Sequence, residues 1–377
     1  MTAGAWTATH LDVSDVRSWT RVSVDLPPGG IVLSGPNGAG KTSLVEALVM
    51  ACLGVSCRTT RDAEVVRTGA PALHVGLDLL GPDGAHRREV GYAQGQGRRL
   101  SLDGQPMRSL GDWRADGSVL VFLPEELRAV KGPPAARRRH LDRLLEASEP
   151  GYGDSLAAYG SALAQRNAAL RHARAGRGGV DAVLPWEVAL ADHGAAIVVA
   201  RRQAMRALQE PFARWLRDLG GGAGGVIALE SSPAGLGDVA DDDVHGALAE
   251  RLEHARPREV AAGMTLAGPH RDDVLVGQQR DGVLGDLRRT GSQGEQRTAV
   301  LALLMAHRAH LGERSGLPIL VLDDMLSELD PSRRGLLLDA AVGDGQCILT
   351  TADPVAAQAA ADRGARVMAV REGLLAA

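Results

Sequence analysis

The sequence predicts an α/β fold in which the two ends of the chain build one lobe and the middle forms a mostly helical inserted lobe. Three observations lead to this prediction. Alternating apolar and polar residues, broken by turns rich in glycine and proline, fill residues 1–124. Helical spacing of apolar residues dominates residues 125–257. Strand and helix patterns then alternate over residues 258–377, an order typical of a parallel sheet with helices on both faces.

The N-terminal part of the chain is expected to be mainly strands. Asp83-Gly84 and Asp103-Gly104 are typical of tight hairpin turns, because aspartate and glycine accept the left-handed backbone that such turns need. They separate the strands of an antiparallel meander. The expected elements are strands near 11–16, 22–26, 31–33, 72–80, 89–92, 100–102 and 118–123, and a helix over 42–51.

The middle of the chain is expected to be helical. Apolar residues three, four and seven positions apart follow Asp154, which is the expected N-cap of their helix. A longer helical pattern runs over 186–219, where Pro211 is expected to kink or split the helix. A last helix is expected over 242–255, so we place the end of the insertion at residue 257.

The C-terminal part returns to alternating helices and strands. The short apolar runs are too β-rich for helices, and the helices between them allow parallel pairing. The expected order is helix 292–311, strand 319–322, helix 332–342, strand 346–350, helix 354–361 and strand 366–370.

Composition and charge exclude several classes of protein. With 377 residues, 45% hydrophobic and 23% charged, the chain has a globular composition. No uninterrupted apolar run reaches the ~18 residues of a membrane span, and the N-terminus lacks the pattern of a signal peptide. Three cysteines without metal-ligand spacing predict reduced thiols in a cytoplasmic protein with no membrane partner. The net charge of −4 means that any contact with nucleic acid has to come from a local patch.

One glycine-rich loop matches the P-loop pattern of nucleotide-binding proteins. An apolar strand precedes it and a helix follows it, as that motif requires. Glycines let backbone N–H groups surround a phosphate, the lysine reaches the β- and γ-phosphate oxygens, and the threonine hydroxyl binds Mg²⁺. ATP and Mg are therefore the expected cofactors. The loop consists of Gly35, Pro36, Asn37, Gly38, Ala39, Gly40, Lys41 and Thr42.

A P-loop needs a carboxylate at the end of a neighbouring buried strand to hold Mg²⁺. The apolar run at 319–322 is followed by Asp323 and Asp324. We assign Asp323 to the metal, together with Thr42. Asp324 is placed to polarise the attacking water, so these two aspartates are the candidate catalytic residues.

Two further segments resemble the ABC-type ATPase superfamily. Ser327 and Asp330 belong to a run similar to the D-loop. A second run precedes a helix and is similar to the signature sequence, and its residues are Ser292, Gln293, Gly294 and Glu295. In that superfamily the signature of one subunit caps the nucleotide on the P-loop of the other. The resemblance implies an ABC-type, SMC-head-like P-loop ATPase lobe and an ATP-dependent homodimer, although a plain helix cap at Ser292 would look similar.

Family-like stretches spread over essentially the whole chain resemble the RecF family. They are residues 122–127, 130–133, 137–142, 165–167, 268–273 and 292–297. The chain lacks the very long coiled coil of SMC proteins. The insertion between Lys41 and Ser292 is also much longer than that of a transporter nucleotide domain.

The RecF resemblance implies a DNA replication and repair protein. Such a protein binds DNA at single-strand gaps or junctions with little sequence specificity. It works with RecO and RecR, and it supports RecA loading and the SOS response. The alternative is a stand-alone SMC-like ABC ATPase with another partner, such as the sensor of a defence system.

Three departures from the ABC pattern predict slow hydrolysis. Glu295 stands where the signature has glutamine, and Asp324 stands where most ABC ATPases have glutamate. The run from Thr350 to Asp353 has no histidine where transporters place a switch histidine. We therefore expect a weak DNA-dependent ATPase in which ATP acts mainly as a switch.

Clusters of cations are the candidate DNA contacts. Arginines and lysines neutralise phosphates without reading bases, which gives sequence-tolerant and salt-sensitive binding. Solvated helix faces paired with carboxylates are the alternative for each cluster. The main cluster is Lys131, Arg137, Arg138, Arg139 and Arg143, and others are Arg201, Arg202 and Arg206, Arg87 and Arg88, and Arg98 and Arg99.

Two further features stay ambiguous in the sequence. His270 with Asp272 and Asp273 is a weak set of metal ligands, so we favour a structural or nucleotide-linked turn there. Arg58 follows the P-loop helix and matches a family arginine. It lies either beside the nucleotide or on the surface.

Overall fold

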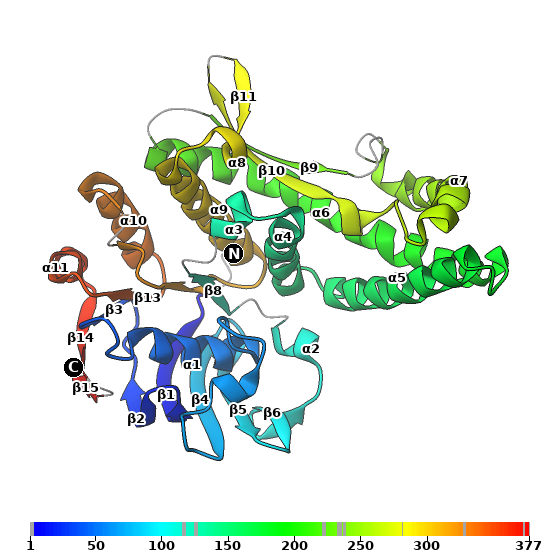
Figure 1. The fold of residues 1–377 in the computed structure, drawn as a ribbon. Helices are drawn as coiled ribbons and strands as arrows, with labels where there is room; N and C mark the ends of the chain where they lie inside the picture. Colours follow the sequence, from blue (N-terminus) through cyan, green and yellow to red (C-terminus); the bar gives the residue numbers. More distant parts are fainter. Residues whose placement is uncertain are drawn as a thin grey trace. The chain divides into compact units, whose positions relative to one another are not determined.

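The computed structural model forms two compact units, of which unit 1 joins Met1–Glu126 to Leu304–Ala377 and unit 2 is Leu127–Leu303. Both ends of the chain therefore build one unit and the middle builds the other, and the predicted α/β class with an inserted lobe is confirmed (Figure 1). The structure describes residues 4–114, 118–123, 127–220, 224–231, 236, 239–280, 282–326, 329–371 and 374–376.

The described residues of unit 1 form two six-stranded sheets. The antiparallel sheet has the order β2-β1-β4-β5-β6-β7, with β1 Thr7–Val16, β2 Trp19–Asp25, β4 Ala72–Gly81, β5 Gly84–Ala93, β6 Gly97–Leu102 and β7 Gln105–Met107. The second sheet has the order β15-β14-β3-β13-β12-β8, with β3 Gly30–Ser34, β8 Val119–Phe122, β12 Ile319–Leu322, β13 Cys347–Thr351, β14 Arg366–Arg371 and β15 Leu374–Ala376. Its strands are parallel except for β15.

Helix α1, Lys41–Leu53, contacts strands of both sheets and forms the centre of the unit 1 core. Every residue from Leu44 to Cys52 is buried, because this stretch is apolar on nearly every side of the helix. Glu46 is the one charged residue in this stretch, and it is buried as well. Helices α10, Pro331–Gly343, and α11, Pro354–Ala361, also contact β3 of the parallel sheet. The pairing of β3 with β13 and of β13 with β12 brings the ends of these strands to one edge, beside the start of α1.

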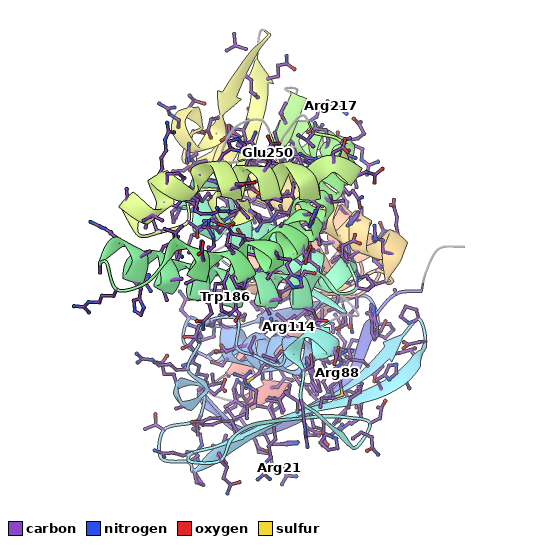
Figure 2. The ribbon with its side chains drawn as sticks, turned by 90° about the vertical axis from the view of Figure 1, so that its right-hand side faces the viewer. Arg21, Arg88, Arg114, Trp186, Arg217 and Glu250 are labelled. Atoms are coloured by element: carbon purple, nitrogen blue, oxygen red, sulfur yellow. The ribbon has the colours of Figure 1, made fainter. Side chains whose placement is uncertain are left out.

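Unit 2 is built on long helices and a three-stranded antiparallel sheet. Helix α6 contacts α5, α7 and the strand β9. The helices are α3 Arg128–Lys131, α4 Pro134–Ser148, α5 Tyr152–Arg174, α6 Leu184–Gly220, α7 Val244–Ala262 and α8 Leu287–Thr290, and α9 Gln293–Arg314 crosses into unit 1. The sheet has the order β11-β10-β9, with β9 Gly224–Glu230, β10 Asp273–Arg280 and β11 Val283–Asp286. Figure 2 shows Trp186 on α6 and Glu250 on α7.

Within the described residues, one helical segment, Val180–Gly220, is long and apolar enough to cross a membrane by length and composition alone. Its best 18-residue window has a mean hydropathy of 1.4. In the structure α6 packs against α5 and β9, and its Arg201 and Arg202 are buried in ion pairs. Its apolar face therefore belongs to the packing of unit 2.

Several sequence expectations differ from the structure in detail. Helix α6 continues through Pro211, because Leu208 before it and Phe212 after it are both buried. The cap of α5 is Gly151 rather than Asp154. The boundary placed at residue 257 falls inside α7, and the units meet instead at Leu303–Leu304, within α9. The sequence analysis also missed the sheet of β9, β10 and β11.

Candidate nucleotide site and signature segment

The P-loop connects β3 to α1 at the edge of the parallel sheet. Gly38 and Gly40 have φ angles of 81° and 105°, which favour glycine. A Cβ atom on Gly35 would lie 2.1 Å from the carbonyl oxygen of Val370. The indole Nε1 of Trp19 donates to the Gly40 carbonyl at 3.0 Å. The loop is thus held from both sides, and its glycines are required by its shape.

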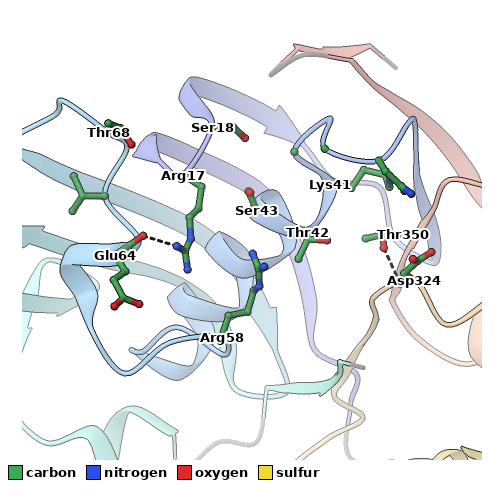
Figure 3. Close-up of a pocket in the computed structure, with 14 residues that line it drawn as sticks. Arg17, Ser18, Lys41, Thr42, Ser43, Arg58, Glu64, Thr68, Asp324 and Thr350 are labelled. Carbon is green, nitrogen blue, oxygen red and sulfur yellow. Dashed lines mark hydrogen bonds between the residues drawn. The ribbon is translucent and has the colours of Figure 1, made fainter. Parts of the chain in front are cut away.

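A polar pocket opens beside this loop, and all of its described lining residues belong to unit 1. Figure 3 shows Lys41 and Asp324 on one side of it and Arg17 and Arg58 on the other. Thr42 and Ser43, from the first turn of α1, lie between them. Three cations and the N-terminal end of a helix therefore surround one space, which suits a polyanion.

Lys41 is directed by the loop itself. Its Nζ donates to the carbonyl oxygens of Gly35 at 2.7 Å and Pro36 at 3.0 Å. Burial lowers the pKa of the Lys41 ammonium, and the negative charges of Asp324 and Asp323 oppose that shift. The ammonium is thus held in the pocket by carbonyl dipoles that phosphate oxygens are able to replace.

Thr42, Asp323 and Thr350 form a hydrogen-bonded cluster at the ends of β12 and β13. The Asp323 carboxylate accepts from the Thr42 hydroxyl at 3.1 Å and from the Thr350 hydroxyl at 2.6 Å. Burial raises the pKa of Asp323, against the effect of these two hydrogen bonds. Hard oxygen ligands and a desolvated carboxylate suit Mg²⁺. The described residues contain no group of three histidine, cysteine or carboxylate ligands, so phosphate and water oxygens would complete the coordination.

Asp324 lies at the exposed mouth of the pocket. Its backbone has a φ of 52°, a left-handed value that costs an aspartate of order 1 kcal/mol. Its backbone N–H donates to the Thr350 hydroxyl at 2.9 Å, which fixes the turn after β12. The two aspartates therefore differ in their surroundings: Asp323 belongs to the buried cluster, and Asp324 lines the open pocket.

The expected D-loop is described only in part. Ser327 lies outside the described residues. Asp330 is the N-cap of α10, and its carboxylate accepts from the backbone N–H groups of Ser332 and Arg333 at 3.1 Å each. In the structure Asp330 thus has a capping role.

The signature-like segment lies in unit 2 at the start of α9. Ser292, Gln293 and Gly294 are exposed. The backbone N–H of Ser292 donates to Glu295 Oε2 at 2.8 Å, and the backbone N–H of Glu295 donates to Ser292 Oγ at 3.3 Å. This reciprocal pair is a capping box. The predicted helix cap and the predicted anion site therefore use the same residues. The Ser292 backbone N–H is already bonded to Glu295.

The candidate DNA contacts separate into buried and exposed residues. Arg137 is 3% exposed and forms an ion pair with Asp273, so the expectation that it faces DNA is wrong. Arg138 is half-buried and donates to the Asp272 carbonyl. Exposed positions are held by Lys131, Arg139 and Arg143.

The other predicted cation clusters mix buried and exposed residues: Arg88, Arg201 and Arg202 are buried, Arg87 and Arg98 are half-buried, and Arg99 and Arg206 are exposed. Arg201 is 2% exposed and pairs with Asp142 and Asp272. Arg88 is buried, donates to the Cys52 carbonyl at 2.8 Å and lies over the Trp113 ring. By contrast, Arg21 and Arg217 are exposed, and Figure 2 shows both. Charge runs in this sequence therefore do not distinguish structural from solvent-facing arginines.

The 268–273 segment forms a buried turn. The Nδ1 atom of His270 lies 2.7 Å from the Tyr159 hydroxyl, and burial lowers the pKa of His270 to about 4. Gly268 has a φ of 129°, and a Cβ there would lie 2.3 Å from the same hydroxyl. Asp272 and Asp273 pair with the arginines of α6 and α4. These contacts favour the structural reading of the segment over the metal site.

The sequence analysis missed Arg17, Glu46 and Glu64. Arg17 and Glu64 line the pocket, as does Arg58, and the buried Glu46 accepts hydrogen bonds from both arginines. Arg17 sits in the turn between β1 and β2, far from the P-loop in sequence. The order of strands β2-β1-β4 brings that turn to α1, and no local motif signals it.

The chain is similar to known proteins over most of its length. Residues 10–95 match the family model of the AAA domain. The DNA replication and repair protein RecF of Moorella thermoacetica is 36% identical over 345 residues, which cover 91% of this chain and 89% of that protein. RecF of Clavibacter michiganensis is 35% identical over 367 residues, covering 91% and 89%.

Solved structures show the same fold. A structure of the recombination mediator protein RecF with ATP, in the RecFOR pathway, has a TM-score of 0.87 at 23% identity and covers 100% of this chain and 98% of that one. An Smc head bound to the C-terminal winged-helix domain of ScpA has a TM-score of 0.60 at 14% identity, covering 98% and 96%. The predicted likeness to SMC heads is confirmed at the level of the fold.

Proposed function

The chain belongs to the RecF family of DNA replication and repair proteins, and we propose that it acts there as an ATP-driven switch. In this proposal Mg-ATP closes a homodimer on DNA and hydrolysis opens it. The alternative of an SMC-like ATPase with another partner is not favoured, since the likeness to the Smc head is lower, at a TM-score of 0.60 against 0.87.

The observation that carries the proposal is that Lys41 and Thr42 line one pocket with further cations, while the buried Asp323 accepts a hydrogen bond from Thr42. Backbone N–H groups of the P-loop and Lys41 bind the phosphates. Thr42 and Asp323 hold Mg²⁺, which when bound neutralises charge on the phosphates. A ligand with fewer charges would leave part of this cationic lining unused.

The signature segment supports the homodimer. Its described residues lie in unit 2 at an exposed helix N-terminus, whereas the described pocket residues all belong to unit 1. A second copy of the chain brings Ser292 and Gly294 to the phosphates of the first. The backbone donors at the start of α9 then bind oxygens that the P-loop does not reach.

Asp324 is the residue that we assign to hydrolysis. It lies at the mouth of the pocket, where its carboxylate orients a water and accepts its proton. Its short side chain seats that water less closely than a glutamate would. We therefore propose slow, DNA-dependent hydrolysis, which suits a switch better than a motor.

For DNA we propose the exposed cations Lys131, Arg139 and Arg143. They contact backbone phosphates at single-strand gaps or junctions with little sequence specificity. RecO and RecR are the proposed partners, and RecA loading and the SOS response are the proposed processes. The three cysteines are free thiols, which supports a cytoplasmic location.

The test measures the retention of gapped DNA and the self-association of the protein in one set of samples. Wild type with Mg-ATP is expected to sediment as a dimer and to retain gapped DNA, and to do neither without nucleotide. Lys41→Met removes a charged donor to phosphate, so its ATP affinity falls by roughly 100-fold and both responses disappear. DNA retention that is the same with and without ATP, in both proteins, would contradict the proposal.

A further inference from the structure

Glu46 is a buried carboxylate behind the nucleotide pocket. It lies on α1, five residues after Lys41, and is 0% exposed. It is absent from the described lining of the pocket, yet it contacts two residues that form that lining, Arg17 and Arg58. Nothing assigned so far to the P-loop, the metal or the water requires this residue.

The Glu46 carboxylate accepts hydrogen bonds from two arginines and one serine. Arg17 Nε donates to Oε2 at 2.9 Å and Nη2 donates to Oε1 at 2.8 Å, which is the strong two-pronged arrangement. Ser56 Oγ donates to Oε1 at 2.5 Å, and Arg58 Nη1 approaches Oε2 at 3.4 Å. Both oxygens of one carboxylate are thus occupied by groups from two separate segments, the turn after β1 and the loop after α1.

The surrounding groups favour the ionised form of the Glu46 carboxylate. Burial acts to raise the pKa of Glu46, but the hydrogen bonds from Arg17 and Ser56 outweigh it and the pKa is lowered. The hydrogen bond to Glu46 likewise raises the pKa of Arg17. Two guanidinium groups repel each other across one pocket, and the shared carboxylate offsets that repulsion before any nucleotide arrives.

The backbone of Arg17 gives an independent sign that its side chain is needed at this place. Its φ is 53°, in the left-handed region where glycine or asparagine is usual. The turn is clamped, because the Arg17 N–H donates to the Val65 carbonyl at 2.8 Å and a guanidinium nitrogen donates to the Glu64 carbonyl. An arginine kept in a strained conformation points to a role for its guanidinium.

We propose that Glu46 is the positioning residue of the nucleotide pocket. It holds Arg17 and Arg58 so that their solvent-facing sides, 26% and 41% exposed, are presented to the triphosphate. Figure 3 shows both guanidinium groups directed into the same region, beside Thr42 and Ser43. This inference rests on the proposed binding of ATP and adds the residue that pre-orders the cations which receive it.

The variant Glu46→Gln distinguishes a positioning role from a purely electrostatic one, because the two roles change ATP affinity in opposite directions. It removes a negative charge near an anionic ligand, so a purely electrostatic role makes ATP bind more tightly. A positioning role makes ATP bind about tenfold more weakly, because the guanidinium groups lose their anchor. Titration calorimetry with Mg-ATP on the full chain measures this, and an unchanged or tighter affinity overturns the inference.

Glu64→Gln is the matched control. It removes the same charge from a carboxylate at the pocket that bonds instead to Thr59 and Arg61. The bond from Arg17 to Glu64 goes to the backbone carbonyl and survives the change. ATP is expected to bind slightly more tightly to this variant, opposite to Glu46→Gln.

A double-mutant cycle tests the coupling. Arg17→Gln alone weakens ATP binding, and adding Glu46→Gln to it has a smaller effect than in the wild-type chain. Fully additive effects overturn the inference, since a structural role would lower Tm without coupling the two affinities. If Glu46→Gln alone fails to fold, the double variant removes both partners of the buried pair and folds more readily; wild-type ATP affinity in it contradicts the inference.

Lys41→Met distinguishes a failure of this inference from a failure of the proposed function. If wild type binds no ATP, and so cannot be told from Lys41→Met, the proposed function is wrong. If wild type binds ATP, Lys41→Met does not, and Glu46→Gln binds as tightly as wild type, only the role of Glu46 is wrong.

Discussion

The two units use their charged residues in different ways. In unit 1, Lys41, Arg17 and Arg58 line an open pocket, and the buried Glu46 forms ion pairs with the two arginines. In unit 2, Arg137 and Arg201 are buried against carboxylates. The backbone donor of Ser292 is likewise already bonded, within its own capping box.

In the proposed mechanism this difference distinguishes ATP binding from dimerisation. In that mechanism the unit 1 half-site exchanges the hydrogen bonds from Lys41 Nζ to the Gly35 and Pro36 carbonyls for phosphate oxygens. The signature half-site has to exchange an internal hydrogen bond for a phosphate oxygen. ATP binding and the proposed dimerisation are therefore two steps with separate free energies, and the predictions below separate hydrolysis, dimerisation and DNA binding from ATP affinity.

The largest effect is expected from Asp324→Asn. An amide cannot accept the proton of the attacking water, so hydrolysis slows by roughly 100-fold or more. The amide keeps the shape of the residue and the backbone N–H bond to Thr350, so ATP affinity is retained. Single-turnover hydrolysis measures the rate, and sedimentation with Mg-ATP is expected to show a dimer that persists. A variant that hydrolyses like wild type would remove Asp324 from the reaction.

Glu295→Gln tests the unit 2 half-site and is expected to have a moderate effect. Glutamine preserves a capping box, so α9 stays intact, while the negative charge that faces an incoming triphosphate is removed. The ATP-dependent dimer is expected to become about fivefold tighter, in line with the stabilisation of charges at helix ends. Analytical ultracentrifugation over a concentration series measures this.

The control for Glu295→Gln adds a charge instead of removing one. Gln293→Glu places a carboxylate on the neighbouring exposed residue at the same helix end, and its dimer is expected to weaken. ATP affinity of the monomer should stay the same in both variants. Equal dimer affinity in the two proteins would mean that the signature does not meet the phosphates.

The nucleotide site was predictable from the sequence because its parts are local. The P-loop, the apolar run before Asp323 and the segment around Ser292 each carry their chemistry within eight residues or fewer, so spacing alone identifies them. The strand and helix order of both chain ends was predictable for the same reason. Periodicity reports which face of an element is buried.

What the sequence did not show depends on contacts between distant segments. Arg17 reaches the pocket only through the pairing of β1 with β4 and the packing of α1. Arg137 and Arg139 lie on opposite faces of α4, and which of the two faces is buried depends on the packing of that helix. Asp273, the partner of Arg137, lies 136 positions away. No local pattern contains that information.

The smallest effect is expected from the exposed cations of α4, and it sharpens the contrast with the buried ones. Arg139→Ala and Arg143→Ala each remove one phosphate contact, so the affinity for gapped DNA falls about threefold and the salt slope of log affinity by about 0.9. Fluorescence anisotropy across a salt series measures both. Arg137→Ala instead removes a buried ion pair with Asp273, to which Arg288 Nη1 also lies at 3.6 Å, and costs about 3 kcal/mol of folding stability. If the salt slope stays at the wild-type value in both exposed variants, DNA binds elsewhere on the protein. The positive surface of α4 would then be no more than a solvated helix face.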